Sequence, residues 1–186
     1  GHGHFDQLGL QLYHEGIPFI TDYGASRFHN IPQKEGGRYL KENNTWANQT
    51  IAHNTLVVGR ESQYQGIDSD ADKGSSHLVF EEFSDSLNVI VAMDSSAYEG
   101  STLMRYHMLL RTGGYDYLID VQSLRSDEKV EVDAPFYFNE HLVYSAPKIS
   151  YYEDNLTSFG DRNGYQHLWK EGSALESLSS THTWQS

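Results

Sequence analysis

The sequence predicts an all-β domain of the antiparallel β-sandwich type. Short stretches of alternating apolar and polar residues recur along the chain, and clusters of turn-forming residues separate them at regular spacing. No stretch of about twelve or more residues repeats its apolar positions with the period of a helix. The 186 residues are enough to bury a sizeable core, and we expect one domain over residues 1–186.

The first stretch predicts a hairpin. Residues 4–13 alternate apolar and polar side chains, residues 14–16 form a turn, and residues 17–22 return as a second strand. If the first strand begins as early as His2, then His2, His4 and Asp6 share one of its faces.

Residues 23–44 predict a long loop with one helical turn near residues 38–42. A loop of about twenty residues is uncommon in a compact domain unless it is functional or disordered. Thr45 is expected to cap a short helical turn over residues 46–48. Residues 51–58 are expected to form a third strand, with His53 near its start.

The rest of the chain predicts further strands. Residues 76–83 and 87–93 flank a turn at Ser84-Asp85-Ser86, and residues 103–111 and 115–121 flank a turn at Thr112-Gly113-Gly114. More strands are expected over residues 130–139, 148–153 and 165–170. Strands joined in this way indicate an antiparallel sandwich.

The formal net charge of −13 argues against a nucleic-acid partner, because phosphate binding needs concentrated Lys and Arg. The basic residues of segment 27–58 are Arg27, Lys34, Arg38 and Lys41, and this patch either receives a polyanion or is an ordinary solvated loop. No run of about eighteen apolar residues exists, so no membrane span is expected. Because the chain has no cysteine, any metal must be held by His and carboxylate.

Four side chains near the N-terminus have the chemistry of a metal site: His2, His4, Asp22 and His53. Two imidazoles and a carboxylate suit a zinc ion, with water or a neighbour in the fourth position. Asp6 and Asn54 are available to fix the imidazole tautomers. The alternative is a hydrogen-bonded structural pair in the His-x-His motif, since His often serves structural roles.

Tyr39 is the candidate acid or base. Arg38 and Lys41 lie beside it in the sequence, and nearby cations lower the pKa of a phenol. Arg27 offers a two-pronged grip on a carboxylate. The alternatives are a structural tyrosine, one of 13 in the chain, and a loop arginine paired to the acidic body.

These motifs together resemble the heparinase II/III-like lyases, and most closely the oligoalginate lyases of polysaccharide lyase family seventeen. The resemblance rests on Gly1-His2-Gly3-His4-Phe5-Asp6, Asp22-Tyr23-Gly24, Gly37-Arg38-Tyr39-Leu40-Lys41 and Ala52-His53-Asn54-Thr55, and it is dense over residues 1–65. It implies that His4, Asp22 and His53 bind one zinc ion. It also implies that His2 and Tyr39 are catalytic, and that Arg27, with Arg38 and Lys41, binds the substrate.

The resemblance further implies a uronate β-elimination, acting exolytically on oligomeric alginate in the periplasm or outside the cell. Such lyases join an N-terminal (α/α) toroid to a C-terminal β-sandwich. Since the chain begins without Met and inside a motif, we expect it to be the sandwich part of a longer protein and to be inactive alone. Its partners would be the toroid, an acidic oligosaccharide and, as an open alternative, a second copy. The rival functions are a lyase for heparin, heparan sulfate or another uronate polymer, a non-catalytic carbohydrate-binding sandwich and a metal-dependent hydrolase.

Overall fold

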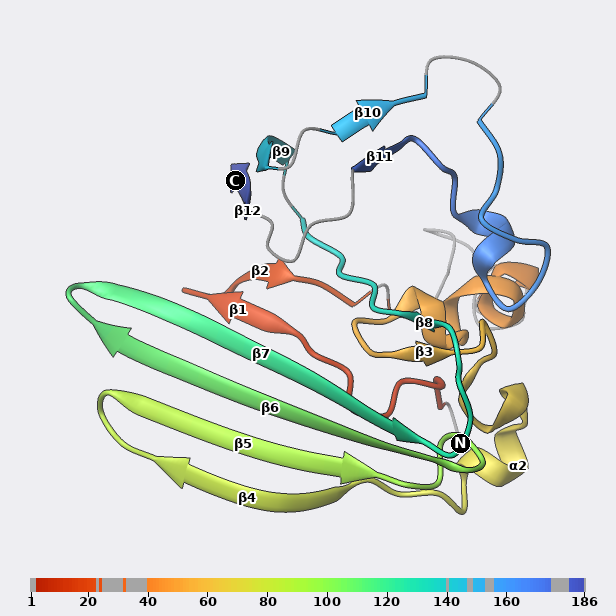
Figure 1. Ribbon diagram of the computed structural model, residues 1–186, viewed down its shortest axis with the longest axis horizontal. Coiled ribbons are helices and arrows are strands. Elements are labelled where there is room, and N and C mark those ends of the chain that lie inside the picture. The colour runs from red at the N-terminus through yellow and green to blue at the C-terminus, as the bar shows by residue number, and fades with distance from the viewer. Residues whose placement is uncertain are drawn as a thin grey trace.

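The computed structural model describes residues 3–22, 24, 32, 40–139, 141–146, 149–152, 156–174 and 181–185, with the backbone alone described for 141–146 and 181–185. Antiparallel strands dominate these residues and only short helical turns occur among them, so the predicted all-β sandwich class is confirmed. Figure 1 shows one long sheet below and a group of smaller sheets above it.

The long sheet contains the strands β4 (His77–Phe83), β5 (Leu87–Asp94), β6 (Ser101–Thr112) and β7 (Tyr115–Ser126), in that order. Each strand pairs antiparallel with the next one along the chain. The two hairpins predicted at residues 84–86 and 112–114 therefore both form. The second is tight because Gly113 and Gly114 adopt the positive φ angles of 61° and 80° that its turn requires.

The N-terminal hairpin forms, but its first strand is shorter than expected. It pairs β1 (Leu12–His14) with β2 (Ile17–Ile20) through a turn at residues 15–16. Residues 3–11 are not a strand, so the expected shared face of His4 and Asp6 does not exist. The reason is a tight turn, in which the Gly9 amide donates to the Asp6 carbonyl at 2.9 Å and Leu8 takes a φ of 60°.

The segment before residue 58 also differs from the prediction. It consists of a π-helical turn, η1 (Asn43–Ala47), a 3-10 turn, η2 (Thr50–Ala52), and only two residues of strand, β3 (Val57–Val58). His53 therefore follows a helical turn and does not begin a strand. Thr45 lies inside η1, where its hydroxyl donates back to the Lys41 carbonyl at 3.2 Å, so it is not a cap.

Four small sheets complete the fold among the described residues. They confirm the strand predicted at residues 148–153, where Ile149–Tyr151 forms, and correct the other remaining strand predictions. The pairs are β1–β2, β3 with β8 (Val132–Asp133), β9 (His141–Ala146) with β12 (Thr181–Gln185), and β10 (Ile149–Tyr151) with β11 (Gly172–Ala174). Of the strand predicted at 130–139 only β8 forms. Residues 165–170 contain the 3-10 turn η4 (Tyr165–His167), not a strand. Two helical turns follow β3, namely η3 (Gln63–Gly66) and α2 (Asp68–Ala71).

The core lies where the N-terminal segment packs between the long sheet and β3. One cluster of buried side chains joins Phe5, Leu56, Val58, Tyr64 and Leu103, with Ala97 beside them. A second, smaller cluster joins Ile51, Val57 and Tyr165. The core thus fixes residues 5 and 51–58, which flank two of the candidate metal ligands.

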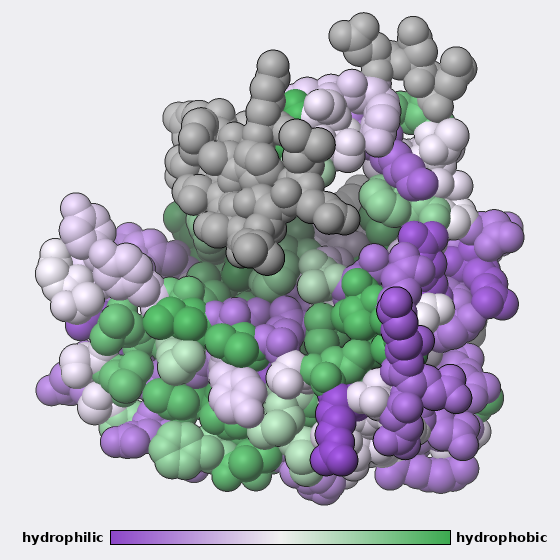
Figure 2. Space-filling model, viewed as in Figure 1, coloured by the Kyte–Doolittle hydropathy of each residue, from purple (hydrophilic) through white to green (hydrophobic). Residues whose placement is uncertain are grey.

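The long sheet also presents apolar side chains outward. Figure 2 shows hydrophobic residues gathered over this sheet. The large exposed ones on its strands are Leu78, Val79, Phe80, Phe83, Leu87, Ile90, Tyr115, Tyr117, Ile119 and Val121. Apolar side chains on both faces are typical of a sheet that is one layer of a larger layered fold.

Among the described residues, every helix is too short and too polar to cross a bilayer.

Candidate metal centre

Three side chains from separate segments meet at one point. His4, Asp22 and His53 each offer a ligand atom, and these atoms lie within 4.8 Å of one another. His4 precedes the turn at residues 6–9, Asp22 follows β2, and His53 follows η2. The convergence expected from the sequence is therefore present, although none of the three residues lies in a strand.

His53 is the most constrained of the three. Its ring is fully buried, and its Nε2 lies 3.0 Å from the Ala47 carbonyl oxygen. Ala47 ends η1, so its carbonyl lacks a partner within the helical turn and is free to accept from the ring. A proton on Nε2 leaves Nδ1 directed at Asp22, and Nδ1 is then available to a metal ion.

Asp22 uses its two carboxylate oxygens differently. Oδ1 accepts a hydrogen bond from the Gly24 amide at 2.8 Å, a turn that Gly24 permits with its φ of 68°. Oδ2 lies 2.8 Å from His53 Nδ1. Burial raises the pKa of Asp22, but the hydrogen bonds from His53 and Gly24 outweigh it, so the pKa falls below its usual value. Asp22 is therefore charged at neutral pH.

His4 completes the set beside His53. The two imidazole centroids are 5.0 Å apart, with the rings tilted by 35°. Burial and the neighbouring His53 lower the pKa of His4, against the smaller opposing effects of Asp6 and Asp22. A lowered pKa keeps the ring neutral, which is the form that binds metal.

The backbone around His4 is fixed against the segment that leads to His53. The Phe5 amide donates to the Asn48 carbonyl at 3.0 Å, and the Thr50 hydroxyl donates to the Phe5 carbonyl at 2.7 Å. Thr50 is itself fully buried. The spacing between the two imidazoles therefore depends on main-chain contacts within the core.

Asn54 ties the third segment to the other two, a role that differs from the one expected of it. Its buried amide group donates to the carbonyls of Leu10, at 3.0 Å, and Thr21, at 2.6 Å, and accepts from the Tyr137 amide. Asn54 thus holds backbone next to Asp22 and does not bond an imidazole. The carbonyl that orients His53 belongs to Ala47 instead.

This donor set fits a zinc ion. Zinc takes imidazole nitrogen and carboxylate oxygen at roughly 2.0–2.2 Å, with four ligands in all. Two imidazoles, one charged carboxylate and a carbonyl that lies within hydrogen-bond distance of the His53 ring are all present. The set leaves one coordination position for water or for another group.

The remaining predicted site residues fall mostly outside the described residues. His2, Arg27, Arg38 and Tyr39 are all in this position. Lys41 is described and lies exposed at the start of the helical turn that continues into η1.

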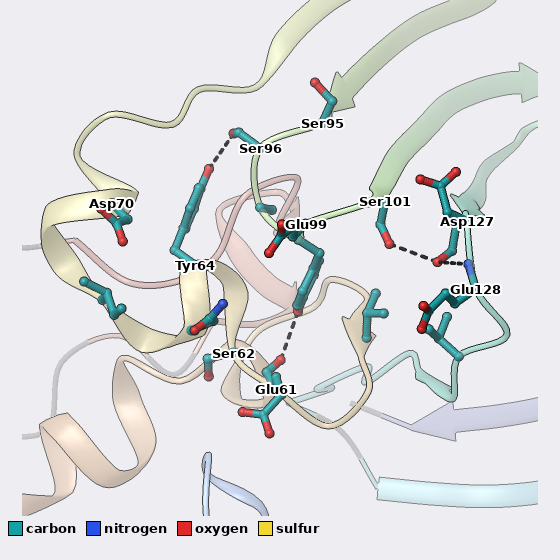
Figure 3. A pocket seen from close by; sticks show the side chains of 18 residues that line it. Glu61, Ser62, Tyr64, Asp70, Ser95, Ser96, Glu99, Ser101, Asp127 and Glu128 are labelled. Atoms are coloured by element: carbon teal, nitrogen blue, oxygen red, sulfur yellow. Dashed lines mark hydrogen bonds between the residues drawn. The ribbon is translucent and has the colours of Figure 1, made fainter.

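A separate pocket is chemically wrong for a uronate. It has a volume of about 830 Å³, and carboxylates from Glu61, Asp70, Glu99, Asp127 and Glu128 line it. Figure 3 shows Asp70 near the Tyr64 side chain, and Asp127 and Glu128 on the opposite side of the view, beside Ser101. None of the three metal-site residues lines this pocket. Negative charge at these carboxylates would repel an acidic sugar, so the pocket does not suit a uronate.

The sequence interpretation missed a buried ion pair beside the centre. Arg105 on β6 binds Asp120 on β7, with Nε–Oδ1 at 2.8 Å and Nη2–Oδ2 at 2.9 Å. Arg105 lies two residues after Leu103 on the strand, so the two side chains share the buried face of the sheet. The predicted hairpin at 112–114 would have placed it near Asp120. A charge at an apolar strand position was therefore the available signal.

Comparison with known proteins adds the family. The model for the heparinase II/III-like C-terminal domain matches residues 1–185. The chain belongs to this family. The domain is 37% identical to an exo-oligoalginate lyase of Saccharophagus degradans over 99% of the chain and 25% of the relative. It is also 37% identical to an alginate lyase of Stenotrophomonas maltophilia, over 96% of the chain and 25% of that relative. This heparinase II/III-like domain therefore spans about a quarter of the length of these curated relatives.

Proposed function

We propose that the full-length protein is a polysaccharide lyase that cleaves oligomeric alginate by β-elimination, acting from the chain end. The observation that supports this most is the convergence of His4, Asp22 and His53 in a domain of the heparinase II/III-like family. The two curated relatives are named for activity on alginate, and one is named as an exo-acting enzyme.

In the proposal, one zinc ion occupies the centre formed by His4, Asp22 and His53. When bound, it supplies a fixed divalent charge that joins three chain segments. Ala47 orients His53 through its carbonyl, and Gly24 fixes the Asp22 carboxylate. These contacts hold the two ligand side chains in fixed orientations for the metal ion.

The proposed chemistry breaks two bonds at one uronate residue. A base removes the proton at C5, beside the carboxylate, and the C4 glycosidic oxygen leaves as a C4–C5 double bond forms. The C5 proton is weakly acidic while the carboxylate is fully charged. Donors that neutralise that carboxylate therefore lower the barrier, and we assign this role to His2 and Arg27.

Proton transfer is assigned to Tyr39. Its sequence neighbours Arg38 and Lys41 would favour the phenolate and attract the acidic sugar. The leaving oxygen needs a proton, which a phenol can return. Sulfated polymers would call for more cations than this segment holds, so we favour alginate over heparin or heparan sulfate.

We further propose that the rest of the protein includes an (α/α) toroid that completes the substrate cleft. The relatives are about four times as long as this domain, which leaves ample length for it. A polymeric, charged substrate would be met in the periplasm or outside the cell, and we propose that location.

The test is a lyase assay of the full-length protein. Polymannuronate, polyguluronate and heparan sulfate are each supplied while ultraviolet absorbance and product size are followed. We expect absorbance to rise on an alginate substrate with release of an unsaturated monosaccharide. New reducing ends without absorbance would indicate a hydrolase, and binding without products would indicate a carbohydrate-binding domain. Either result would overturn the proposal.

A further inference from the structure

Arg105 is a buried cation with an unusual set of partners. Its side chain is only 3% exposed, and its charge is paired with Asp120 through two nearly parallel hydrogen bonds. His107 Nε2 lies 3.0 Å from the same carboxylate. Gln122 also donates to Asp120, at 3.1 Å. Arg105 and Gln122 therefore hydrogen-bond this carboxylate while His107 lies within ion-pair distance, and the paired bonds from Arg105 fix the plane of the guanidinium.

The third nitrogen of Arg105 does not bind this carboxylate and instead bonds two main-chain carbonyls near the candidate metal ligands. Nη1 donates to the Leu8 carbonyl at 2.6 Å and also to the Asn54 carbonyl. Leu8 lies in the tight turn that follows His4, and Asn54 directly follows His53. One nitrogen atom thus joins the two backbone segments that carry the two imidazoles.

Asp120 is charged under all ordinary conditions. Burial raises its pKa, but His107 and Arg105 outweigh this and bring the pKa to about 2. The guanidinium therefore keeps its counter-ion. Without that charge, Arg105 would be a buried cation that favours water over the two carbonyls.

A purely structural role is the main alternative. Buried ion pairs often stabilise a fold no better than a well-packed apolar pair would. An apolar pair could not, however, hold the Leu8 and Asn54 carbonyls on one donor. The fork of a guanidinium can do both, because Nε and Nη2 face Asp120 while Nη1 remains available. The geometry is thus specific to arginine.

We propose that Arg105 is a positioning residue of the metal centre. From its place on the long sheet, and anchored by Asp120, it fixes the distance between His4 and His53. This inference rests on the proposed metal centre. Groups that orient metal ligands without touching the metal commonly change metal affinity by roughly 10–100-fold when they are replaced.

The experiment measures zinc affinity of the full-length protein by competition with a chromophoric chelator. It also measures the melting temperature with zinc and with excess chelator. Arg105→Lys keeps the charge but cannot bind Asp120 and both carbonyls at once. Asp120→Asn keeps the shape but removes the counter-charge. The matched control is Arg111→Lys, on the same strand, where the arginine is exposed and lies 3.9 Å from Asp116.

We expect Arg105→Lys and Asp120→Asn to weaken zinc binding roughly 10–100-fold and to reduce the rise in melting temperature that zinc produces. Arg111→Lys should bind zinc as the wild type does. Arg105 would have only a structural role if the folded Arg105→Lys variant bound zinc as tightly as the wild type and its melting temperature fell by the same amount with zinc and with chelator. If Arg105→Lys does not fold, Asp120→Asn decides by the same criterion. A wild-type protein that binds no zinc would remove the metal centre itself, and this inference with it.

Discussion

His53 Nδ1 lies 2.8 Å from Asp22 Oδ2, although 31 positions separate the two residues in the sequence. His53 is fully buried, and the Asp22 side chain is 15% exposed. An imidazole nitrogen and a carboxylate oxygen, both possible metal ligands, thus lie side by side in a mostly buried position. Because metal ligands must be deprotonated, a metal ion that took both atoms would compete with protons for them.

Replacing His53 should remove the metal and destabilise the fold. His53→Ala deletes a candidate ligand, leaves the Ala47 carbonyl without its donor and opens a cavity. We expect zinc content to fall to background and the free energy of unfolding to drop by about 2–4 kcal/mol. Metal analysis and urea titration measure the two effects. His77→Ala, at an exposed histidine of β4, is the control, and an unchanged zinc content in His53→Ala would exclude it as a ligand.

Asn54 should matter for stability more than its size suggests. Its buried amide serves three backbone groups, those of Leu10, Thr21 and Tyr137. Asn54→Ala leaves all three without their partner, and we expect a loss of about 3 kcal/mol or more in the free energy of unfolding. Asn88→Ala, which removes one exposed contact to Ser84, should change it by less than about 0.5 kcal/mol. Equal losses in the two variants would contradict this role.

The metal-free protein should lose stability as the pH falls. Burial and His53 hold the pKa of His4 below its usual value, so the unfolded chain binds a proton there more readily than the folded one. The free energy of unfolding should therefore rise toward neutral pH and decrease below about pH 6.5. Urea titrations in chelator at several pH values measure it. Added zinc should stabilise the protein at neutral pH and less so in acid, because bound imidazole must be unprotonated.

Asp120 predicts a second, more acidic transition. Its pKa of about 2 in the folded protein lies below the 3.8 of an unperturbed aspartate, so its stabilisation is complete above pH 3.8 and is lost between there and pH 2. Since the carboxylate is 10% exposed, the effect is at most about 2 kcal/mol. Asp120→Asn should flatten the acid limb of the stability curve. A mutant curve that runs parallel to the wild type through this range would contradict the assignment.

Tyr39 carries the strongest prediction about activity. If its phenol transfers the proton, Tyr39→Phe should lower turnover of the full-length enzyme by roughly 100-fold or more, with little change in zinc content. Initial rates from ultraviolet absorbance measure this. The matched control is Tyr13→Phe, at a tyrosine that is 59% exposed in the N-terminal hairpin. Wild-type turnover in Tyr39→Phe would exclude it as the acid or base.

The strands that the sequence predicted well are those whose signal is local. In the long sheet, turn residues at 84–86 and 112–114 fix where each hairpin folds, and the alternating side chains between them set its extent. The strand expected from residue 4 failed because a turn at residues 6–9 interrupts an alternating pattern. The strand expected over 51–58 failed because the backbone amides of Ala52, His53 and Thr55 donate to carbonyls within the same segment instead of to a neighbouring strand.

The sequence by itself determined the antiparallel β class and the two long hairpins, because propensity, alternation and turn chemistry act over a few neighbouring residues. It also indicated the candidate metal ligands by their residue types. Only the tertiary structure decided that the Ala47 carbonyl orients His53, that Asn54 clamps backbone, and that Arg105 reaches the ligand segments from another sheet. The contacts of Asn54 and Arg105 join residues far apart in the chain, and the partners in all three cases are mostly main-chain carbonyls. Every residue has such a carbonyl, so no sequence pattern marks the one that will be used.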